Sequence, residues 1–184
     1  MVEGKKLGPA DFSFTGILGR GAYGRVAKAT KKDSGEIFAI KIVDKQHLQR
    51  VIATQEGKTS QALVEKNILA KLKNHPGTVR LYYTFQDAEN LYFVLEYCPR
   101  GDFLSLINSF KSQMPIDLIR FYTAELVSIL EVMFDNGVVH RDLKPENLLI
   151  SEDYHLRLSD FGTAKDLAAG GGRDRSHTFV GTAE

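Results

Sequence analysis

Polar side chains are concentrated in the stretch GVVHRDLKPENLL, which covers residues 137–149. Between its two apolar ends, VV and LL, it carries His140, Arg141, Asp142, Lys144, Glu146 and Asn147. A solvated surface turn seldom has apolar anchors on both sides and a proline in the middle. The pattern therefore favours a loop that is pinned at both ends and presents its polar side chains to a site.

Three of the oxygen-bearing side chains in this half of the sequence suit a magnesium site with a neighbouring base. Asp142 and Asn147 belong to the polar loop, and Asp160 follows a short apolar strand and precedes Phe161 and Gly162. Carboxylate and amide oxygens are ligands that Mg²⁺ prefers, and a carboxylate can orient a hydroxyl group. The tripeptide DFG alone is a weak signal, whereas HRDLKPEN is a specific one.

A glycine-rich stretch, GRGAYGRV, covers residues 19–26 and follows the pattern G-x-G-x-x-G-x-V. Glycines at these positions allow backbone amides to approach an anion closely. On this motif alone, an ordinary glycine-rich hairpin remains an equal alternative. A dinucleotide-binding fold would need a helix directly after the third glycine, whereas RVAKATKK continues as a strand.

An ion pair is suggested by the strand FAIK, residues 38–41, and the helical stretch that follows it. A strand lysine such as Lys41 usually extends to solvent, so a functional role for Lys41 would require an acidic partner. Glu65 lies on the apolar stripe that Ala62, Ile68 and Leu69 mark at helical spacing. A carboxylate buried on such a stripe needs a cation, which predicts a Lys41–Glu65 ion pair. A slightly rotated helix, with Glu65 exposed at its rim, is the alternative.

The elements that must position these residues divide the chain into two parts. Strand-like patterns cover residues 14–18, 24–29, 37–43, 79–85, 91–97, 147–150 and 155–158. Helical patterns cover about 45–73 and the region from 102 to a stop at Asn136 and Gly137. We therefore expect an α+β fold, with a strand-rich lobe, a helix-rich lobe, a hinge near 97–101 and a cleft between the lobes.

Composition limits the classes of function. The sequence has 184 residues, of which 43% are hydrophobic and 26% charged, with a formal net charge of +1. This balance does not favour bulk electrostatic attraction to nucleic acid or membranes, so we expect neither as a partner. A single cysteine, Cys98, excludes an internal disulfide framework and fits a reducing compartment. With neither an apolar signal segment nor a long apolar run, we expect a cytoplasmic location.

The glycine loop, AIK, Glu65, HRDLKPEN and DFG, in this order, resemble the protein-kinase signature set from about Phe14 to the last residue. The lysine in HRDLKPEN is similar to that of serine/threonine kinases rather than tyrosine kinases. LYYTFQD, DFGTAK and TFVGTA resemble the AGC group and, within it, the 3-phosphoinositide-dependent protein kinases.

This resemblance implies a bilobal kinase-like fold, in which a five-stranded antiparallel sheet with one main helix forms the N-lobe. Residues 1–13 would be an extension, 14–97 the N-lobe, and 98–184 the hinge and an incomplete, mostly helical C-lobe that ends in the activation segment. With the rest of that lobe missing, the apolar underside of the helix at 119–133 would be exposed.

The resemblance also assigns cofactors and roles, namely ATP and Mg²⁺ bound between the lobes. Asp142 would accept a hydrogen bond from the substrate hydroxyl, and Lys144 would offset charge at the γ-phosphate. Lys41 would hold the α- and β-phosphates, and Glu65 would orient it. The metal ligands would be Asn147 and Asp160. The residues around ATP would be Leu18, Gly19, Gly21, Gly24, Val26, Ala39, Lys41, Leu95, Glu96, Cys98, Asp102, Glu146 and Leu149.

Regulation and partners follow from the same resemblance. Thr178 would be a phosphosite, with Arg141 and Lys165 as basic contacts for its phosphate. The protein substrates would be other AGC kinases, phosphorylated on activation-segment serine or threonine in phosphoinositide-linked growth signalling. They would dock a hydrophobic motif on an N-lobe pocket, and regions absent from this sequence would supply any membrane recruitment. The alternative is a truncated fragment that binds nucleotide or a partner without turnover.

Overall fold

A computed structural model describes residues 7–21, 24–53, 61–73, 75–111 and 113–168. The chain divides into two compact units: unit 1 is Met1–Ser60 with Leu81–Tyr97, and unit 2 is Gln61–Arg80 with Cys98–Glu184. The change of unit between residues 97 and 98 lies where the sequence places the hinge. Residues 61–80, which the sequence places in the first lobe, pack within unit 2 instead.

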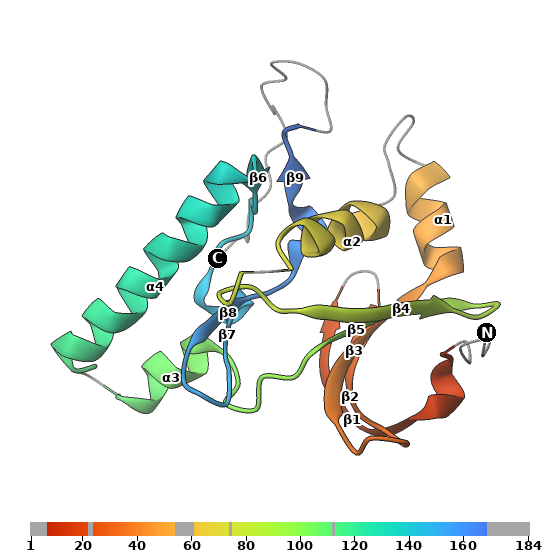
Figure 1. Ribbon diagram of the computed structural model, residues 1–184, viewed down its shortest axis with the longest axis horizontal. Coiled ribbons are helices and arrows are strands. Elements are labelled where there is room, and N and C mark those ends of the chain that lie inside the picture. The colour runs from red at the N-terminus through yellow and green to blue at the C-terminus, as the bar shows by residue number, and fades with distance from the viewer. Residues whose placement is uncertain (1–6, 22–23, 54–60, 74, 112, 169–184) are drawn as a thin grey trace, which may run out of the picture. The chain divides into compact units, whose positions relative to one another are not determined.

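Unit 1 is built on a five-stranded antiparallel sheet in the order β1-β2-β3-β5-β4 (Figure 1). Its strands are β1 (Phe12–Gly21), β2 (Gly24–Lys31), β3 (Ile37–Asp44), β4 (Leu81–Gln86) and β5 (Asn90–Glu96). Short connections join β2 to β3 and β4 to β5, and such connections suit antiparallel neighbours. The predicted sheet is confirmed, although β4 begins two residues later than the sequence pattern suggests.

Alternation along the strands places one face of this sheet over an apolar core. The core cluster consists of Phe12, Ala27, Ala29, Phe38, Ile40, Ile42, Tyr92 and Val94. Because successive strand residues point to opposite faces, the i, i+2 spacing of Phe38, Ile40 and Ile42 brings all three to this side. Two helices flank the strands in sequence: the short 3₁₀ helix η1 (Pro9–Asp11) and α1 (Lys45–Ala53).

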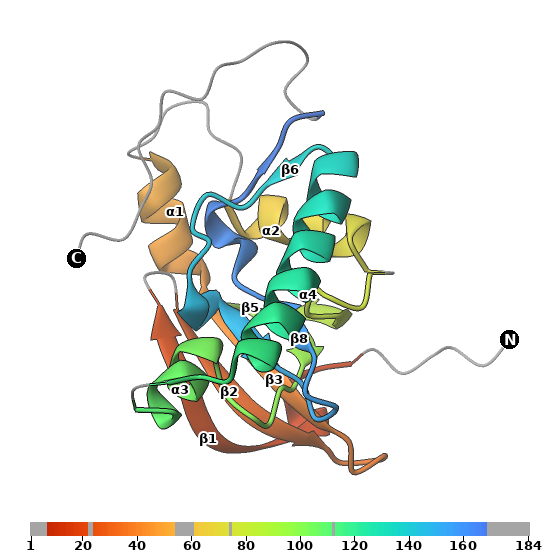
Figure 2. The same ribbon diagram turned by 90° about the vertical axis from the view of Figure 1, so that its left-hand side faces the viewer.

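The described part of unit 2 contains three α-helices, two 3₁₀ turns and two short strand pairs. The helices are α2 (Gln61–Lys71), α3 (Phe103–Ser109) and α4 (Ile116–Asp135), with the 3₁₀ turns η2 (Pro145–Asn147) and η3 (Phe161–Thr163). Strand β6 (Val138–Val139) pairs with β9 (Lys165–Asp166), and β7 (Leu148–Ile150) pairs with β8 (Leu156–Leu158). Figure 2 shows β6 continuing directly from the end of α4.

The buried face of α2 agrees with the sequence pattern. Ala62, Ile68 and Leu69 are all buried, and Glu65 lies on the same face with only 4% of its surface exposed. Helix α2 contacts η3, the turn that follows Asp160. The prediction that Glu65 is on the buried side of its helix, rather than at the rim, is therefore confirmed.

Helix α4 buries only part of its apolar surface. Tyr122, Ile129 and Met133 are buried, whereas Ile119 is 42% and Phe134 83% exposed. This agrees with the exposed apolar underside expected for this helix. Gly137, with φ of +62°, follows the C-cap residue and ends the helix where the sequence predicts. Within the described residues, no helix combines the length and the apolar character that crossing a bilayer requires.

Candidate active site

The polar loop between β6 and β7 holds Asp142 by two neighbours. The side-chain amide of Asn147 donates to the backbone oxygen of Asp142 at 2.7 Å and to its carboxylate Oδ2 at 3.1 Å. The Lys144 ammonium lies 3.1 Å from the same Oδ2. Because η2 begins at Pro145, its first turn has the fixed φ that brings Asn147 back toward Asp142. The side chains of Asp142, Lys144 and Asn147, all from the polar loop, are therefore adjacent.

His140 joins this loop to the segment that carries Asp160. Its ring is 3% exposed, its Nδ1 accepts the Asp142 N–H at 3.3 Å, and its Nε2 lies 2.9 Å from the Ser159 carbonyl oxygen. Burial lowers the pKa of His140, against the opposing effect of the hydrogen bond to Ser159 and the charges of Asp160 and Asp142. The neutral ring with its proton on Nε2 satisfies both contacts.

Asn147 and Asp160 lie on segments that are bonded to each other. The Ser159 amide and hydroxyl both donate to the Asn147 carbonyl oxygen, at 2.8 and 2.9 Å. The amide nitrogen of Asn147 is directed at Asp142, which leaves the side-chain oxygen of Asn147 as its donor atom for a cation. Together with the carboxylate of Asp160, it would supply two hard oxygen ligands, a donor set that fits Mg²⁺.

Backbone strain marks the two ends of this arrangement. Arg141 has φ of +69° and Asp160 has φ of +55°, both in the left-handed region that costs non-glycine residues free energy. Arg141 Nε donates to the Thr163 oxygen at 2.6 Å, and the Thr163 hydroxyl donates to the His140 oxygen at 3.1 Å. These bonds offset the strain. Thr163 had no predicted role, and only its position one residue after DFG pointed to it.

Phe161 anchors the turn after Asp160 in the core of unit 2. Its side chain is fully buried and meets the His140 ring edge-on, with 5.1 Å between ring centroids. This ring contact joins the turn after Asp160 to the polar loop that carries Asp142.

In unit 1, strand register brings several residues predicted to bind ATP to one face of the sheet. Val26 is opposite Lys41, and Leu95 is opposite Ala39. Directly opposed residues share a face, and Ala39 and Lys41 are two apart on one strand, so all four lie on the face opposite the apolar core. The sheet therefore gathers one lysine and three apolar side chains into a single patch.

The glycine-rich hairpin connects β1 to β2. Gly19 pairs with Val26 and Gly21 with Gly24, while residues 22–23 lie outside the described residues. Gly24 has φ of +157°, and a Cβ there would lie 1.9 Å from the Ile42 carbonyl oxygen. A side chain is therefore incompatible with this close approach of β2 to β3.

The other predicted ATP contacts are distributed over both units. Leu18, on β1, is exposed, and Glu96 ends β5, whereas Cys98 is buried in unit 2. Asp102 caps α3, with Oδ1 accepting the Ser105 amide at 2.8 Å and Oδ2 the Ser105 hydroxyl at 3.1 Å. Its predicted contact with ATP would have to share the carboxylate with this cap.

Two further ATP contacts belong to unit 2: Leu149 is half-buried on β7, and Glu146 is exposed in η2. Lys41 and Glu65 belong to different units, so their pairing stays a prediction. Thr178 lies outside the described residues.

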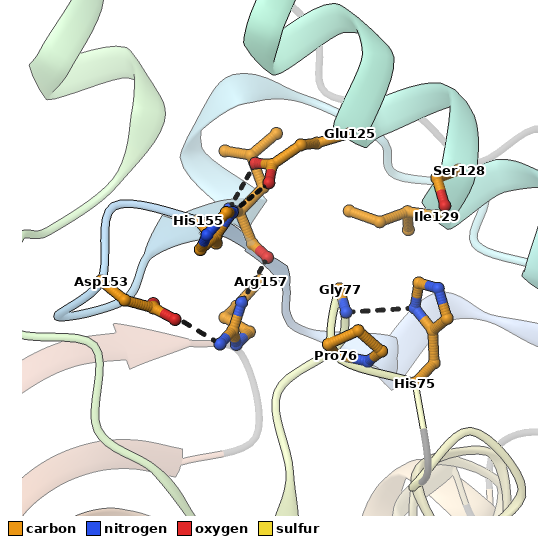
Figure 3. A pocket seen from close by; sticks show the side chains of 10 residues that line it. His75, Pro76, Gly77, Glu125, Ser128, Ile129, Asp153, His155 and Arg157 are labelled. Carbon is orange, nitrogen blue, oxygen red and sulfur yellow. Dashed lines mark hydrogen bonds and ion pairs between the residues drawn. The ribbon is translucent and has the colours of Figure 1, made fainter.

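A cavity of about 410 Å³ lies elsewhere in unit 2, between the loop His75–Gly77, helix α4 and the β7–β8 hairpin (Figure 3). None of its lining residues belongs to the predicted catalytic, ATP or metal set. His75 Nδ1 accepts the Gly77 amide at 3.1 Å, and burial, followed by the charge of Arg157, lowers the pKa of His75. The cavity is therefore distinct from the polar loop.

Comparison with known proteins agrees with this geometry. The protein kinase domain model matches residues 12–184. The chain is 45% identical to 3-phosphoinositide-dependent protein kinase B of Dictyostelium discoideum, over 97% of this chain and 19% of that protein. It is 42% identical to 3-phosphoinositide-dependent protein kinase 1 of Homo sapiens, over 98% of this chain and 31% of that protein. It is 41% identical to 3-phosphoinositide-dependent protein kinase 1 of Arabidopsis thaliana, over 94% of this chain and 35% of that protein. The chain thus spans roughly a fifth to a third of these relatives.

Proposed function

Because this chain belongs to the protein kinase family, we propose that it transfers the γ-phosphoryl group of ATP to serine or threonine hydroxyls of proteins. The observation that carries this proposal is the position of Asp142. Its carboxylate is held by Asn147 and lies 3.1 Å from the Lys144 ammonium. A carboxylate fixed in this way can orient a hydroxyl without having to reorganise during the reaction.

In the proposed reaction, Asp142 accepts a hydrogen bond from the substrate hydroxyl. The hydroxyl oxygen forms a bond to the γ-phosphorus while the bond from that phosphorus to the β,γ-bridging oxygen breaks, which releases ADP. The hydroxyl proton passes to Asp142. Lys144 offsets negative charge next to the transferred group. Phosphoryl transfer depends mostly on positioning and charge stabilisation, so a rigid loop is the main requirement.

Nucleotide binding would use both units. Mg²⁺, held by Asn147 and Asp160, would neutralise charge on the phosphate oxygens. In the same proposal, Lys41 contacts the phosphates, Glu65 orients Lys41, and the apolar side chains on its face of the sheet contact the adenine. The buried position of Glu65 supports its part, because a buried carboxylate needs a cationic partner.

The finer proposal is that the substrates are activation-segment serine or threonine residues of other AGC kinases in phosphoinositide-linked growth signalling. Identity of 41–45% to proteins named 3-phosphoinositide-dependent protein kinases supports it. Docking of a hydrophobic motif, phosphorylation of Thr178, a cytoplasmic location and membrane recruitment by other regions belong to the same proposal.

Substitution of Asp142 tests the reaction directly. We expect Asp142→Asn to abolish transfer of ³²P from Mg-ATP to a kinase substrate, because an amide is a far weaker acceptor for the hydroxyl hydrogen bond and proton. Asp117→Asn is the matched control, since Asp117 lies on the exposed surface of α4 and pairs only with Arg120 among the described residues. Full transfer by Asp142→Asn would refute the assigned role.

A second candidate is a module that binds nucleotide or a protein partner without turnover. The exposed apolar side of α4, with Phe134 at 83%, favours it, because a helix this apolar usually has a packing partner. Thermal denaturation with and without Mg-ATP, next to the transfer assay, separates the two functions. Stabilisation without transfer would favour the binding module, and transfer would exclude it.

A further inference from the structure

An ion pair links the end of helix α2 to strand β9, far away in the sequence. Lys71 Nζ lies 3.2 Å from Asp166 Oδ1 and 3.1 Å from Oδ2, so the ammonium meets both carboxylate oxygens. The side chains are 31% and 21% exposed, which makes the pair only partly accessible to water. No sequence motif identified either residue.

The pair lies where three parts of unit 2 meet. Helix α2 contacts η3 and β9, and η3 directly follows Asp160. Strand β9 pairs with β6, and the Leu167 amide donates to the Gly137 oxygen at 2.8 Å. One side of the segment after Asp160 is therefore bonded to the strand that precedes His140, and its other side is joined to the helix that carries Glu65.

We propose that Lys71 is a positioning residue. Through Asp166 it holds the segment after Asp160 against helix α2, so that loss of the ion pair loosens both β9 and the turn Phe161–Ala164. Helix α2 and the segment of Asp160 then act as one rigid body because charge joins them at one end and the packing of η3 joins them at the other.

The size of the effect follows from the exposure of the pair. Partly exposed ion pairs contribute little, because solvent screens them and long side chains lose freedom. A net contribution of this class corresponds to an increase of about 1.4- to 5-fold in the local opening of the segment. A positive charge near the C-terminus of a helix also stabilises that helix without any carboxylate partner. The experiment must therefore separate this general effect of Lys71 from its ion pair with Asp166.

Amide hydrogen exchange over residues 160–168 measures this opening. We expect faster exchange in Lys71→Ala and in Asp166→Asn, and no further increase in the double variant, because either change removes the same pair. Lys71→Arg should exchange as the wild type does. Lys73→Ala is the matched control, because it removes one positive charge two residues after Lys71 and leaves the Lys71–Asp166 pair intact. It should also leave exchange unchanged.

Wild-type exchange in Lys71→Ala, an equal increase in Lys73→Ala, or an additive double variant would overturn the proposal. The link to catalysis rests on the proposed kinase function and has a separate readout. We expect kcat/KM of Lys71→Ala to fall by about the same factor as exchange rises, with rescue by Lys71→Arg. Unchanged kcat/KM beside faster exchange would refute the positioning role. Failure of the wild type to transfer phosphate would refute the proposed function, while exchange alone would still decide whether the pair holds the segment.

Discussion

Replacement of Gly77 by alanine should destabilise unit 2 because the glycine allows a backbone to pass directly over helix α4. A Cβ at Gly77 would lie 2.3 Å from Ile129 Cγ1, 2.9 Å from His75 Cε1 and 3.0 Å from Ile129 Cδ1. Ile129 is 1% exposed and lines the cavity of unit 2, so its side chain can avoid the added Cβ only by leaving its present rotamer. The loop cannot move away easily either, since the Leu158 amide donates to the Gly77 oxygen at 2.8 Å.

Overpacking of this kind costs about 1–3 kcal/mol, and the reduced entropy of the unfolded chain with alanine offsets about 0.4–1 kcal/mol of it. We therefore expect a net loss of about 1–2 kcal/mol in the free energy of unfolding. For a chain of this size the loss lowers Tm by about 2–8 °C, measurable by calorimetry or circular dichroism. Gly16→Ala is the control, since no atom lies within 4 Å of a Cβ there.

A double-mutant cycle tests the cause. If the side chain of Ile129 is the obstacle, Gly77→Ala should cost much less in an Ile129→Ala background than in the wild type. Equal stability of Gly77→Ala and the wild type would refute the steric reasoning, and so would the same cost in both backgrounds.

Two further predictions concern the buried histidine and the glycine hairpin. Burial lowers the pKa of His140 in the folded state, so its stabilising effect is complete above about pH 6.5, the ordinary pKa of histidine. Below that pH the unfolded chain takes up a proton that the folded chain does not. The free energy of unfolding should then fall by up to about 1.4 kcal/mol per pH unit until the folded pKa is reached. Denaturant unfolding between pH 8 and 5.5 should show a steeper decline in the wild type than in His140→Gln, and equal slopes would contradict the reasoning. Gly24→Ala should weaken Mg-ATP binding and lower Tm, because a Cβ would lie 1.9 Å from the Ile42 oxygen; wild-type values for both in isothermal calorimetry and melting would refute it.

Local patterns in the sequence were sufficient for the elements and for the contents of the polar loop. Short runs rich in β-branched and aromatic residues, separated by turn residues, predict the strands of unit 1, and apolar spacing predicts α2 with Glu65 on its buried face. Asp142, Lys144 and Asn147 are within a few residues of each other, and a proline lies among them. Their adjacency therefore follows from a single short turn and needs no knowledge of distant contacts.

Contacts between distant parts of the chain could not be predicted in this way. The sequence places residues 61–80 with the first lobe, yet in the structure they pack within unit 2, where η3 and β8 provide their contacts. Likewise, no pattern points to the bonds that Thr163 makes with His140 and Arg141, because Thr163 lies 23 and 22 residues away from them in the sequence.

The sequence by itself determined the family, the strands and helices, and the groups available for phosphoryl transfer, since these depend on residue type and short spacing. Only the tertiary structure decided how those groups are held. The proton position on His140, the bonds from Ser159 to Asn147, and the Lys71–Asp166 pair depend on which segments meet after the chain folds. Such tertiary contacts depend on packing over the whole unit. The residues that make them are too far apart in the sequence for a local pattern to predict them.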